Sequence, residues 1–499
     1  MNKDRQEASP TTLDPSDWDA MRTQGHRMLD DMFDYLENIR ERPVWQPIPA
    51  EVHAQFRQPA PQAPNDLAKL HQTFLERILP YAAGNSHPGF MGWVNGGGNP
   101  VGMLAEMLAA GLNANLGGRN QIPVEVERQV LHWVRGFFRY PDHASGLFVT
   151  GTSMANLIAL WVASRKALGM QVRSQGLSAA SRQLAAYTSA GAHGCVAQAM
   201  DLAGLGTAAL RIIPLNAQFE MDLAALERAI AEDRAAGLHP FFIAATAGSV
   251  DVGAVDPLNA LADIAQREKI WLHVDGAFGA LAILSPELAP RLAGIERTDS
   301  IAFDFHKWGQ VPYDAGFILV RDGEAHHDTF ASPVSYLRRE TRGLAGGSPW
   351  PCDFGPDLSR GFRALKTWFT IQAYGTEKLG QVMAGTCALA QYLKQRIEAE
   401  PALELLAPVS LNIVCFRFRC EAPESNRINA EIAVALQESG IAAPSTTILS
   451  GRLAIRAAIV NHRTQRGDID ALIDATLSLG AKLAKSGTES GTSTGTTTA

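Results

Sequence analysis

The spacing of the apolar positions changes along the chain, and these changes divide it into segments. Residues 17–41 place apolar side chains at helical spacing, which predicts an amphipathic helix. Six prolines between residues 43 and 64 exclude a long helix there and predict an extended strap. A helix and a strap are too small to form a domain, so we expect both to pack on a partner subunit.

From about residue 147 to residue 320, short apolar runs alternate with stretches of helical spacing. The helical stretches lie at 153–168, 222–236 and 257–268. This alternation predicts an α/β domain with a mostly parallel sheet, whose functional residues lie at the carboxyl ends of the strands. The seven apolar runs are Leu147–Val149, Leu184–Tyr187, Leu210–Leu215, Phe241–Ala245, Ile270–Val274, Ile301–Phe305 and Phe317–Val320.

The last part of the chain predicts a smaller α+β unit. A long helical stretch at 361–399 leads into it, and we expect strands at 411–419 and 452–459 and helices at 427–439 and 466–484. We therefore divide the chain into an N-terminal helical segment with its strap (1–84), a large domain (85–370), a small C-terminal domain (371–485) and a disordered, low-complexity tail (486–499).

Composition and charge narrow the class of protein. Apolar residues make up 46% of the chain and the net charge is −7 without a basic run, which argues against nucleic-acid binding. We find no apolar stretch of membrane-spanning length and no signal segment at the N-terminus. The five cysteines show no CxxC spacing, so we expect a cytoplasmic enzyme with neither a disulfide framework nor a metal site.

Two strand ends carry side chains that are costly to bury without a function. Lys307 follows an apolar strand in Asp304-Phe305-His306-Lys307-Trp308, where its amine can form a Schiff base or can simply reach the surface. Asp275 ends the run Trp271–Asp275 and is followed by glycine and Ala277. Such small residues let a flat ring approach, and the aspartate can then bind a ring nitrogen or merely cap a helix.

Three further strand ends carry hydroxyl or imidazole groups. Thr152 and Ser153 open a helix whose free N–H groups can bind a phosphate, although the hydroxyls can also be ordinary caps. His193 lies next to glycine and can stack on an aromatic ring, or can be a polar loop residue. Thr246 ends another strand beside small residues. Together these groups specify one ligand, pyridoxal phosphate, with its aldehyde on Lys307.

The chain also resembles a known family over about residues 17–480. It is similar to the pyridoxal-phosphate-dependent group II amino-acid decarboxylases, which include enzymes for aromatic amino acids, histidine, glutamate and cysteine sulfinate. The stretches that carry the resemblance are His87-Pro88-Gly89-Phe90, Val274-Asp275-Gly276-Ala277, His306-Lys307-Trp308 and Arg363-Ala364-Leu365-Lys366-Thr367-Trp368. The resemblance implies the α/β fold type I, as in aspartate aminotransferase, and a homodimer with shared active sites.

Roles for individual residues follow from the resemblance. It implies that Lys307 is the Schiff-base lysine, Asp275 the partner of the ring nitrogen, and His193 the stacking histidine. Residues expected to bind the cofactor are Thr152, Ser153, His193, Thr246, Asp275, Ala277, Asp304, His306 and Lys307. Those expected near the amino-acid substrate are Trp93, Asn95, Asn113, Asn115 and Arg456, and His306 borders it.

Several positions depart from the aromatic branch of that family. Asp304 stands where asparagine is usual, the segment Val94–Pro100 is glycine-rich, and Asn113-Ala114-Asn115 looks closer to the acidic branch. The substrate class therefore stays open between aromatic, acidic and other amino acids.

A mobile loop in the aromatic branch carries a tyrosine that returns a proton to the substrate's Cα. We match this loop to Arg342–Cys352, a stretch without tyrosine that Tyr336 precedes, and expect a flexible lid. The expected product is an amine, with an oxygen-dependent aldehyde as a minor product.

Other readings of the site remain open. The same fold supports transamination, aldol cleavage, desulfuration and decarboxylation-dependent aldehyde synthesis, and a homologue without catalysis is a more distant alternative. A dinucleotide-binding dehydrogenase is disfavoured because Gly204-Leu205-Gly206 lacks the GxGxxG pattern.

Overall fold

The computed structural model describes residues 12–177, 182–332, 338–420 and 424–491. Its large domain contains a seven-stranded sheet in the order β2-β8-β7-β6-β5-β3-β4. β8 runs antiparallel to β2 and β7, and the other neighbours are parallel. The strands are β2 (Ser145–Val149), β3 (Leu184–Ser189), β4 (Leu210–Ile213), β5 (His239–Thr246), β6 (Trp271–Asp275), β7 (Ser300–Asp304) and β8 (Gly316–Val320). The predicted α/β domain with a mostly parallel sheet is confirmed.

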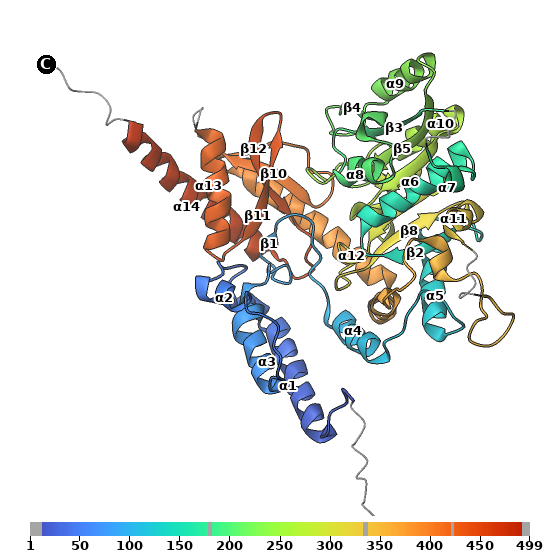
Figure 1. Cartoon of the computed structure of the whole chain (residues 1–499). Helices are drawn as coiled ribbons and strands as arrows, with labels where there is room; N and C mark the ends of the chain where they lie inside the picture. The colour runs from blue at the N-terminus through green and yellow to red at the C-terminus, as the bar shows by residue number, and fades with distance from the viewer. Residues whose placement is uncertain (1–11, 178–181, 333–337, 421–423, 492–499) are drawn as a thin grey trace, which may run out of the picture.

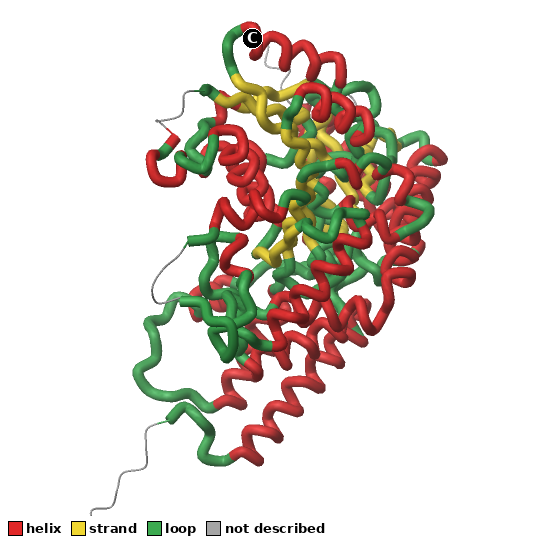
Figure 2. The backbone as a smooth tube through the Cα atoms, turned by 90° about the vertical axis from the view of Figure 1, so that its right-hand side faces the viewer, coloured by secondary structure: helices red, strands yellow, loops and turns green. Residues whose placement is uncertain are grey.

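Helices cover both faces of this sheet, which explains why the strands are apolar without a break (Figure 1). Along β6, Leu272 and Val274 point into one core and Trp271 into the other. One face carries α6 (Thr152–Leu168) and α8 (Cys195–Leu202), and the other carries α5 (Ile122–Phe137), α9 (Leu223–Ala235) and α10 (Leu258–Glu268). Three further helices are α4 (Pro100–Leu112), α7 (Val172–Gln175) and α11 (Gly323–Phe330), of which the last two pack on α6. Figure 2 shows the strands inside and the helices around them.

The small domain contains a five-stranded sheet in the order β1-β11-β12-β10-β9. Its strands are β1 (Phe90–Met91), β9 (Leu403–Leu405), β10 (Ile413–Phe418), β11 (Ala443–Leu449) and β12 (Arg452–Ala458), and its helices are α13 (Ser425–Glu438) and α14 (Arg466–Gly491). β1 pairs with β11, so the predicted boundary at residue 85 wrongly assigns this strand to the large domain. β11 itself was not predicted, because Pro444 and three consecutive hydroxyl residues interrupt its apolar pattern.

One further predicted boundary lies close to a break in the structure, and another differs from it. The stretch at 361–399 forms α12 (Arg363–Ala399), but Gly375 breaks it at φ 72°, a backbone conformation that glycine adopts readily. This break lies close to the predicted boundary between the domains. α14 continues to Gly491, so the predicted disordered tail does not begin at residue 486, and residues 492–499 lie outside the described part of the chain.

The N-terminal segment extends away from both domains (Figure 1). It contains α1 (Trp18–Glu37), α2 (Ala50–Gln55) and α3 (Leu67–Thr73), so the strap is extended only on either side of α2. The start of the strap is bound to the small domain, where the Val44 amide donates to the Gly440 carbonyl at 2.9 Å. No residue of α1 is buried, and its apolar face remains open in the single subunit.

Candidate active site

The carboxyl ends of β5, β6 and β7 bring the predicted residues of the large domain together. Thr246 and Asp275 are register partners at the ends of β5 and β6, and both are buried. The Asp304 amide, at the end of β7, donates to the Ala277 carbonyl at 3.0 Å. Lys307 follows three residues after Asp304. Because parallel strands end at the same edge of a sheet, these five side chains line one site.

Asp275 presents a buried carboxylate that is held by several donors. Its side chain accepts hydrogen bonds from Asn156 Nδ2 at 2.9 Å and from the Ala277 amide at 3.1 Å. The Cys195 thiol lies 3.7 Å from the same carboxylate. Burial, together with the Asp275 charge, raises the pKa of the Cys195 thiol to about 12, so this thiol stays protonated and donates. These donors suit an ionised carboxylate that can bind a protonated ring nitrogen.

Lys307 lies beside two further ionisable groups. Its Nζ is 3.0 Å from Asp304 Oδ2, and the His306 Nε2 is 3.6 Å from the same oxygen. The other His306 nitrogen, Nδ1, accepts the Ala315 amide at 2.9 Å. Tyr313 packs against the His306 ring with a centroid distance of 4.3 Å. Burial lowers the pKa of His306, so the ring is neutral near pH 7 and its orientation is fixed by its neighbours.

The start of α6 provides the features of a phosphate site. Thr152 is the first residue of this helix and is buried, yet among the described residues its Oγ1 has no hydrogen-bond partner. Ser153 is exposed beside it. Since the first amides of a helix also lack partners within the helix, this end offers several donors to an anion.

His193 lies in the turn after β3, immediately before α8, and is exposed in the single subunit. Its Nδ1 accepts the Cys195 amide at 3.2 Å. Cys195 in turn contacts Asp275, the predicted partner of the ring nitrogen. His193 therefore lies two residues along the chain from a direct neighbour of Asp275. Its stacking role stays a prediction.

Three of the predicted substrate residues come together above the backbone of Lys307. The segment 93–98 lies against this backbone, since a Cβ on Gly96 would come within 2.4 Å of the Lys307 carbonyl oxygen. Asn95 Oδ1 accepts the Tyr313 hydroxyl at 2.9 Å. Arg456 donates to the Trp93 carbonyl at 2.9 Å, and its Nη2 is buried without a partner among the described residues.

Asn113 and Asn115 lie elsewhere in the subunit. Asn113 ends α4 at φ 50°, and Asn115 Oδ1 accepts the amides of Gly117 and Arg360. Both residues are exposed in the connection between α4 and α5. Within one subunit they are thus not brought to Lys307, and their role at the substrate stays a prediction that depends on a partner subunit.

Part of the stretch Arg342–Cys352 is anchored to the large domain, and the flexible lid expected there stays a prediction. Trp350 is 1% exposed and donates to the Gly346 carbonyl at 2.8 Å. Arg128 of α5 donates to the carbonyls of Gly347 and Pro349 at 2.7 and 2.8 Å. The buried tryptophan anchors the glycine-rich run that predicted flexibility. Tyr336 lies outside the described residues.

Four residues of the site were not predicted. Asn156, Cys195 and His273 lie behind Asp275, and Tyr313 packs on His306. Two of them left a signal in the sequence. Asn156 is a polar residue on the buried side of an apolar helix, and His273 is two residues before Asp275, so both point to the same face of β6.

Comparisons with known proteins agree with this arrangement. A family profile described as the pyridoxal-dependent decarboxylase conserved domain matches residues 49–419. An aromatic-L-amino-acid decarboxylase of Bacillus atrophaeus is 31% identical over 89% of this chain and 92% of its own length. A phenylacetaldehyde synthase of Arabidopsis thaliana is 30% identical over 90% of this chain and 94% of its own. A crystal structure of Oryza sativa TDC with PLP and tryptamine has a TM-score of 0.86 at 24% identity and covers 95% of this chain and 100% of that one.

The chain therefore belongs to the pyridoxal-phosphate-dependent amino-acid decarboxylases, which are carboxy-lyases of fold type I. Its residues fit the cofactor. The buried Thr152 hydroxyl lacks a partner where a phosphate would bind, and the Asp275 carboxylate is held ready for a ring nitrogen. Lys307 would bind the aldehyde carbon, and the phosphate would lie at the start of α6.

Proposed function

We propose that the protein decarboxylates an aromatic L-amino acid to the corresponding amine and works as a homodimer. The observation that carries the substrate class is the Tyr313 ring, which packs on His306 and is 48% exposed. The Tyr313 hydroxyl donates to Asn95, and Trp93, two residues before Asn95, is 60% exposed. The 31% identity to an aromatic-L-amino-acid decarboxylase supports the same assignment.

Pyridoxal phosphate supplies an electron sink when the bond between Cα and the carboxylate breaks. The chain's own residues do the rest. Asp275 holds the proton on the ring nitrogen, because an ionised carboxylate favours the protonated partner. His193 would restrict the ring and keep water away from it, and His306, fixed by the Ala315 amide, would border the substrate. The site thereby positions the carboxylate for loss, which determines the reaction.

Arg456 is held by two backbone carbonyls and one hydroxyl through its Nε and Nη1, while its Nη2 has no partner among the described residues. It holds the Trp93 carbonyl, the Ser445 hydroxyl and the Asp251 carbonyl at 2.9, 3.0 and 3.1 Å. Trp93 has a φ of 47°, an unusual conformation for a bulky residue that these contacts stabilise. We propose that Arg456 sets the position of Trp93 against the substrate.

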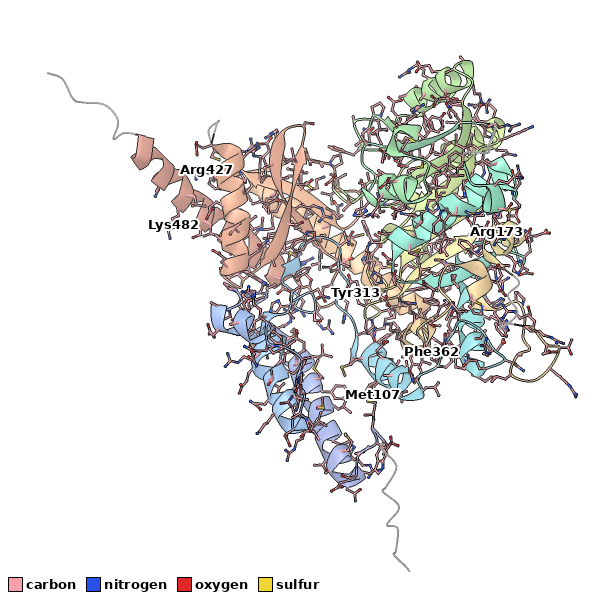
Figure 3. The ribbon with its side chains drawn as sticks, viewed as in Figure 1. Met107, Arg173, Tyr313, Phe362, Arg427 and Lys482 are labelled. Carbon is pink, nitrogen blue, oxygen red and sulfur yellow. The ribbon has the colours of Figure 1, made fainter. Side chains whose placement is uncertain are left out.

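The surface of the subunit supports the homodimer. Met107, Leu108, Leu112 and Ile122 are between 50% and 73% exposed on α4 and at the start of α5. Leu108, Leu112 and Ile122 line a cavity together with Phe362, and Figure 3 shows Met107 and Phe362 on the same side of the molecule. The apolar face of α1 is a second surface that is open in the subunit. An apolar surface of this extent is typical of an interface between subunits.

The five cysteines are all free, which supports our proposal of a cytoplasmic location. In the described part of the chain, no helix has the length and apolar character needed to span a membrane.

A substrate panel tests the proposed function. The purified holoenzyme is incubated with aromatic, acidic and other L-amino acids, and carbon dioxide, amine, peroxide and oxygen uptake are measured together. We expect amine and carbon dioxide in equal amounts from aromatic substrates. A preference for acidic substrates that Arg456→Met abolishes would contradict the substrate class. Peroxide equal to carbon dioxide would make the protein an aldehyde synthase, the activity named for one relative.

A further inference from the structure

A row of buried polar side chains lies behind the Asp275 carboxylate. Trp271 Nε1 donates to Ser300 Oγ at 2.8 Å, and Ser300 Oγ lies 2.8 Å from His273 Nδ1. His273 Nε2 lies 2.8 Å from Asn156 Oδ1, and Asn156 Nδ2 donates to Asp275 at 2.9 Å. All five side chains are buried, with Trp271 the most exposed at 7%.

The chemistry of the two ends gives this row a single direction. An indole N–H can only donate and an ionised carboxylate can only accept. Since Asn156 uses its amide N–H on Asp275, its oxygen must accept from His273 Nε2. The His273 Nδ1 must then accept, so the Ser300 hydroxyl donates to it while accepting from Trp271.

We propose that Trp271, Ser300, His273 and Asn156 form a one-way hydrogen-bond chain that fixes the Asp275 carboxylate for the cofactor's ring nitrogen, with His273 as its positioning residue. This inference rests on the proposed role of Asp275. Without the hydrogen bond from His273, the Asn156 amide can rotate and point its oxygen toward Asp275. The amide oxygen would then repel the carboxylate that the amide N–H now binds. Aligned hydrogen bonds also strengthen one another in a buried environment.

Local packing supports this role. The Phe242 ring stacks on the His273 ring at a centroid distance of 5.5 Å and an interplanar angle of 21°, which restrains the imidazole. Burial lowers the pKa of His273 to about 3, so it is neutral near pH 7 and has one N–H to donate. Trp271, His273 and Asp275 are alternate residues of β6 and therefore share the face that meets α6.

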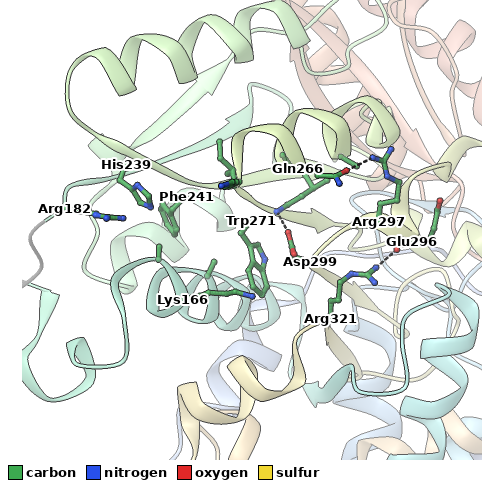
Figure 4. Close-up of a pocket in the computed structure, with 17 residues that line it drawn as sticks. Lys166, Arg182, His239, Phe241, Gln266, Trp271, Glu296, Arg297, Asp299 and Arg321 are labelled. Carbon is green, nitrogen blue, oxygen red and sulfur yellow. Dashed lines mark hydrogen bonds between the residues drawn. The ribbon is translucent and has the colours of Figure 1, made fainter.

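The far end of the chain reaches a separate cavity. Trp271 lines a pocket of about 790 Å³, in which Lys166 Nζ lies 5.6 Å from the indole centroid (Figure 4). Asp275 lies four residue steps beyond Trp271 along β6, which is about 13 Å. A change at Trp271 thus leaves the cofactor site itself untouched, and its effect must pass through the chain.

The subunit also contains a matched control. His326 on α11 is 0% exposed, its pKa is lowered to about 3 by burial, and its Nδ1 lies 2.8 Å from Ser145 Oγ. It repeats the Ser–His pair of the chain but belongs to another part of the large domain. If replacement of any buried histidine lowered the activity, variants of His273 and of His326 would both lose it.

The experiment compares His273→Leu and His273→Gln with His326→Leu in the holoenzyme. We expect His273→Leu to lower kcat by about 10- to 100-fold with little change in KM, as for other residues that orient a functional group from behind. Glutamine can still donate to Asn156, so His273→Gln should recover to within about fivefold of the parent. The absorption band of the bound cofactor should change its pH dependence in His273→Leu and not in His326→Leu.

A second measurement keeps the inference testable if His273→Leu does not fold. Nitrogen-15 spectra of the histidine-labelled protein are recorded with and without cofactor, and we expect His273 to be protonated at Nε2 alone. The same form should persist at about pH 5.5, about one unit below the ordinary histidine pKa of about 6.5. In Trp271→Phe the population with Nδ1 protonated should rise. Protonation at Nδ1 in the parent, or equal losses in His273→Leu and His326→Leu, would overturn the proposal. Normal turnover in Asp275→Asn with the Nε2 form intact would instead contradict the role of Asp275.

Discussion

Lys307 Nζ lies 3.0 Å from Asp304 Oδ2, while Asp304 Oδ1 is buried without a partner among the described residues. A Cβ on Gly151, the residue before α6, would lie 3.8 Å from that free oxygen. The carboxylate therefore stands between the lysine and the start of the helix where the phosphate would bind. Asparagine is usual at this position in the aromatic branch that the chain resembles, so this negative charge is a feature of this chain.

We expect Asp304→Asn to bind pyridoxal phosphate more tightly. The repulsion between a carboxylate and a nearby phosphate costs about 1 kcal/mol when solvent partly screens the two charges. Removal of the Asp304 charge should therefore lower the dissociation constant of the cofactor by about fivefold. Titration of the apoprotein with the cofactor, followed by absorbance, measures this constant. Asp314→Asn is the control, since Asp314 pairs with Arg363 at 2.9 Å. Weaker binding of the cofactor in Asp304→Asn would contradict this prediction. It would show that the contact between Asp304 and Lys307 favours binding by more than the repulsion of the phosphate opposes it.

Asp275→Asn should retain cofactor but lower kcat by about 100-fold or more. An amide cannot hold the charge of a protonated ring nitrogen as a carboxylate does. Steady-state rates and cofactor content of the same preparation check both parts. Asp299, which precedes β7 and thus lies at the opposite end of these parallel strands, supplies the control variant Asp299→Asn. A rate near that of the parent would remove Asp275 from the mechanism.

Borohydride reduction should attach the cofactor to Lys307 irreversibly. Lys307 is the amine that the strand end places beside His306 and Asp304. Mass analysis of the digested protein locates the label. A label on Lys366, which is bound to Glu106 and to the Tyr313 carbonyl, or on Lys269 would overturn the assignment.

Much of this site followed from the sequence because it depends on strand ends. Each apolar run predicted a strand, and residues just past Val274 and Phe303 then had to meet at one edge. The chain through Asn156 and His273 could not be predicted in the same way. It joins residues 117 positions apart, and only the packing of α6 on β6 brings them to 2.8 Å.

Loop positions were harder still. Nothing in the glycine-rich run before Trp350 indicated that Arg128, more than two hundred residues earlier, donates to the carbonyls of Gly347 and Pro349. No strand was predicted at Pro444 and its polar neighbours, yet they form β11 because β1 and β12 flank them on both sides. In each case a partner distant in sequence decides the local structure.

The apolar surface of α4 and α5 should hold two subunits together. Leu112→Glu with Ile122→Glu places two charges on residues that are 60% and 73% exposed, so we expect monomers and loss of activity. Ile448→Glu, at a position 66% exposed in the small domain, is the matched control. Sedimentation velocity distinguishes monomer from dimer. Dimers that persist in the double variant would place the interface elsewhere.

Deletion of residues 1–64 tests the N-terminal segment separately. α1 buries no side chain within its own subunit, so its apolar face needs a partner to cover it. We expect the truncated chain to be insoluble or inactive. A soluble, active, monomeric truncation would contradict the idea that this segment clasps the second subunit.

Acid should destabilise the protein partly through its buried histidines. The pKa of His326 is about 3 in the folded chain, against about 6.5 in the unfolded chain. Its contribution to the free energy of unfolding is therefore complete above about pH 6.5 and is lost as the pH falls toward about 3. Between about pH 7.5 and 5.5 the unfolded chain gains a proton that the folded chain does not, at a cost of about 1.4 kcal/mol.

His326→Gln should therefore reduce the difference in unfolding free energy between these two pH values by about 1.4 kcal/mol. It should also lower stability at both, because the contact with Ser145 is altered. Urea unfolding at about pH 7.5 and 5.5 measures the difference, since equal changes at both pH values cancel. His132→Gln is the control, because the His132 side chain is exposed. An unchanged difference in His326→Gln would mean that this imidazole takes up its proton equally in the folded and the unfolded chain, so that burial does not lower its pKa.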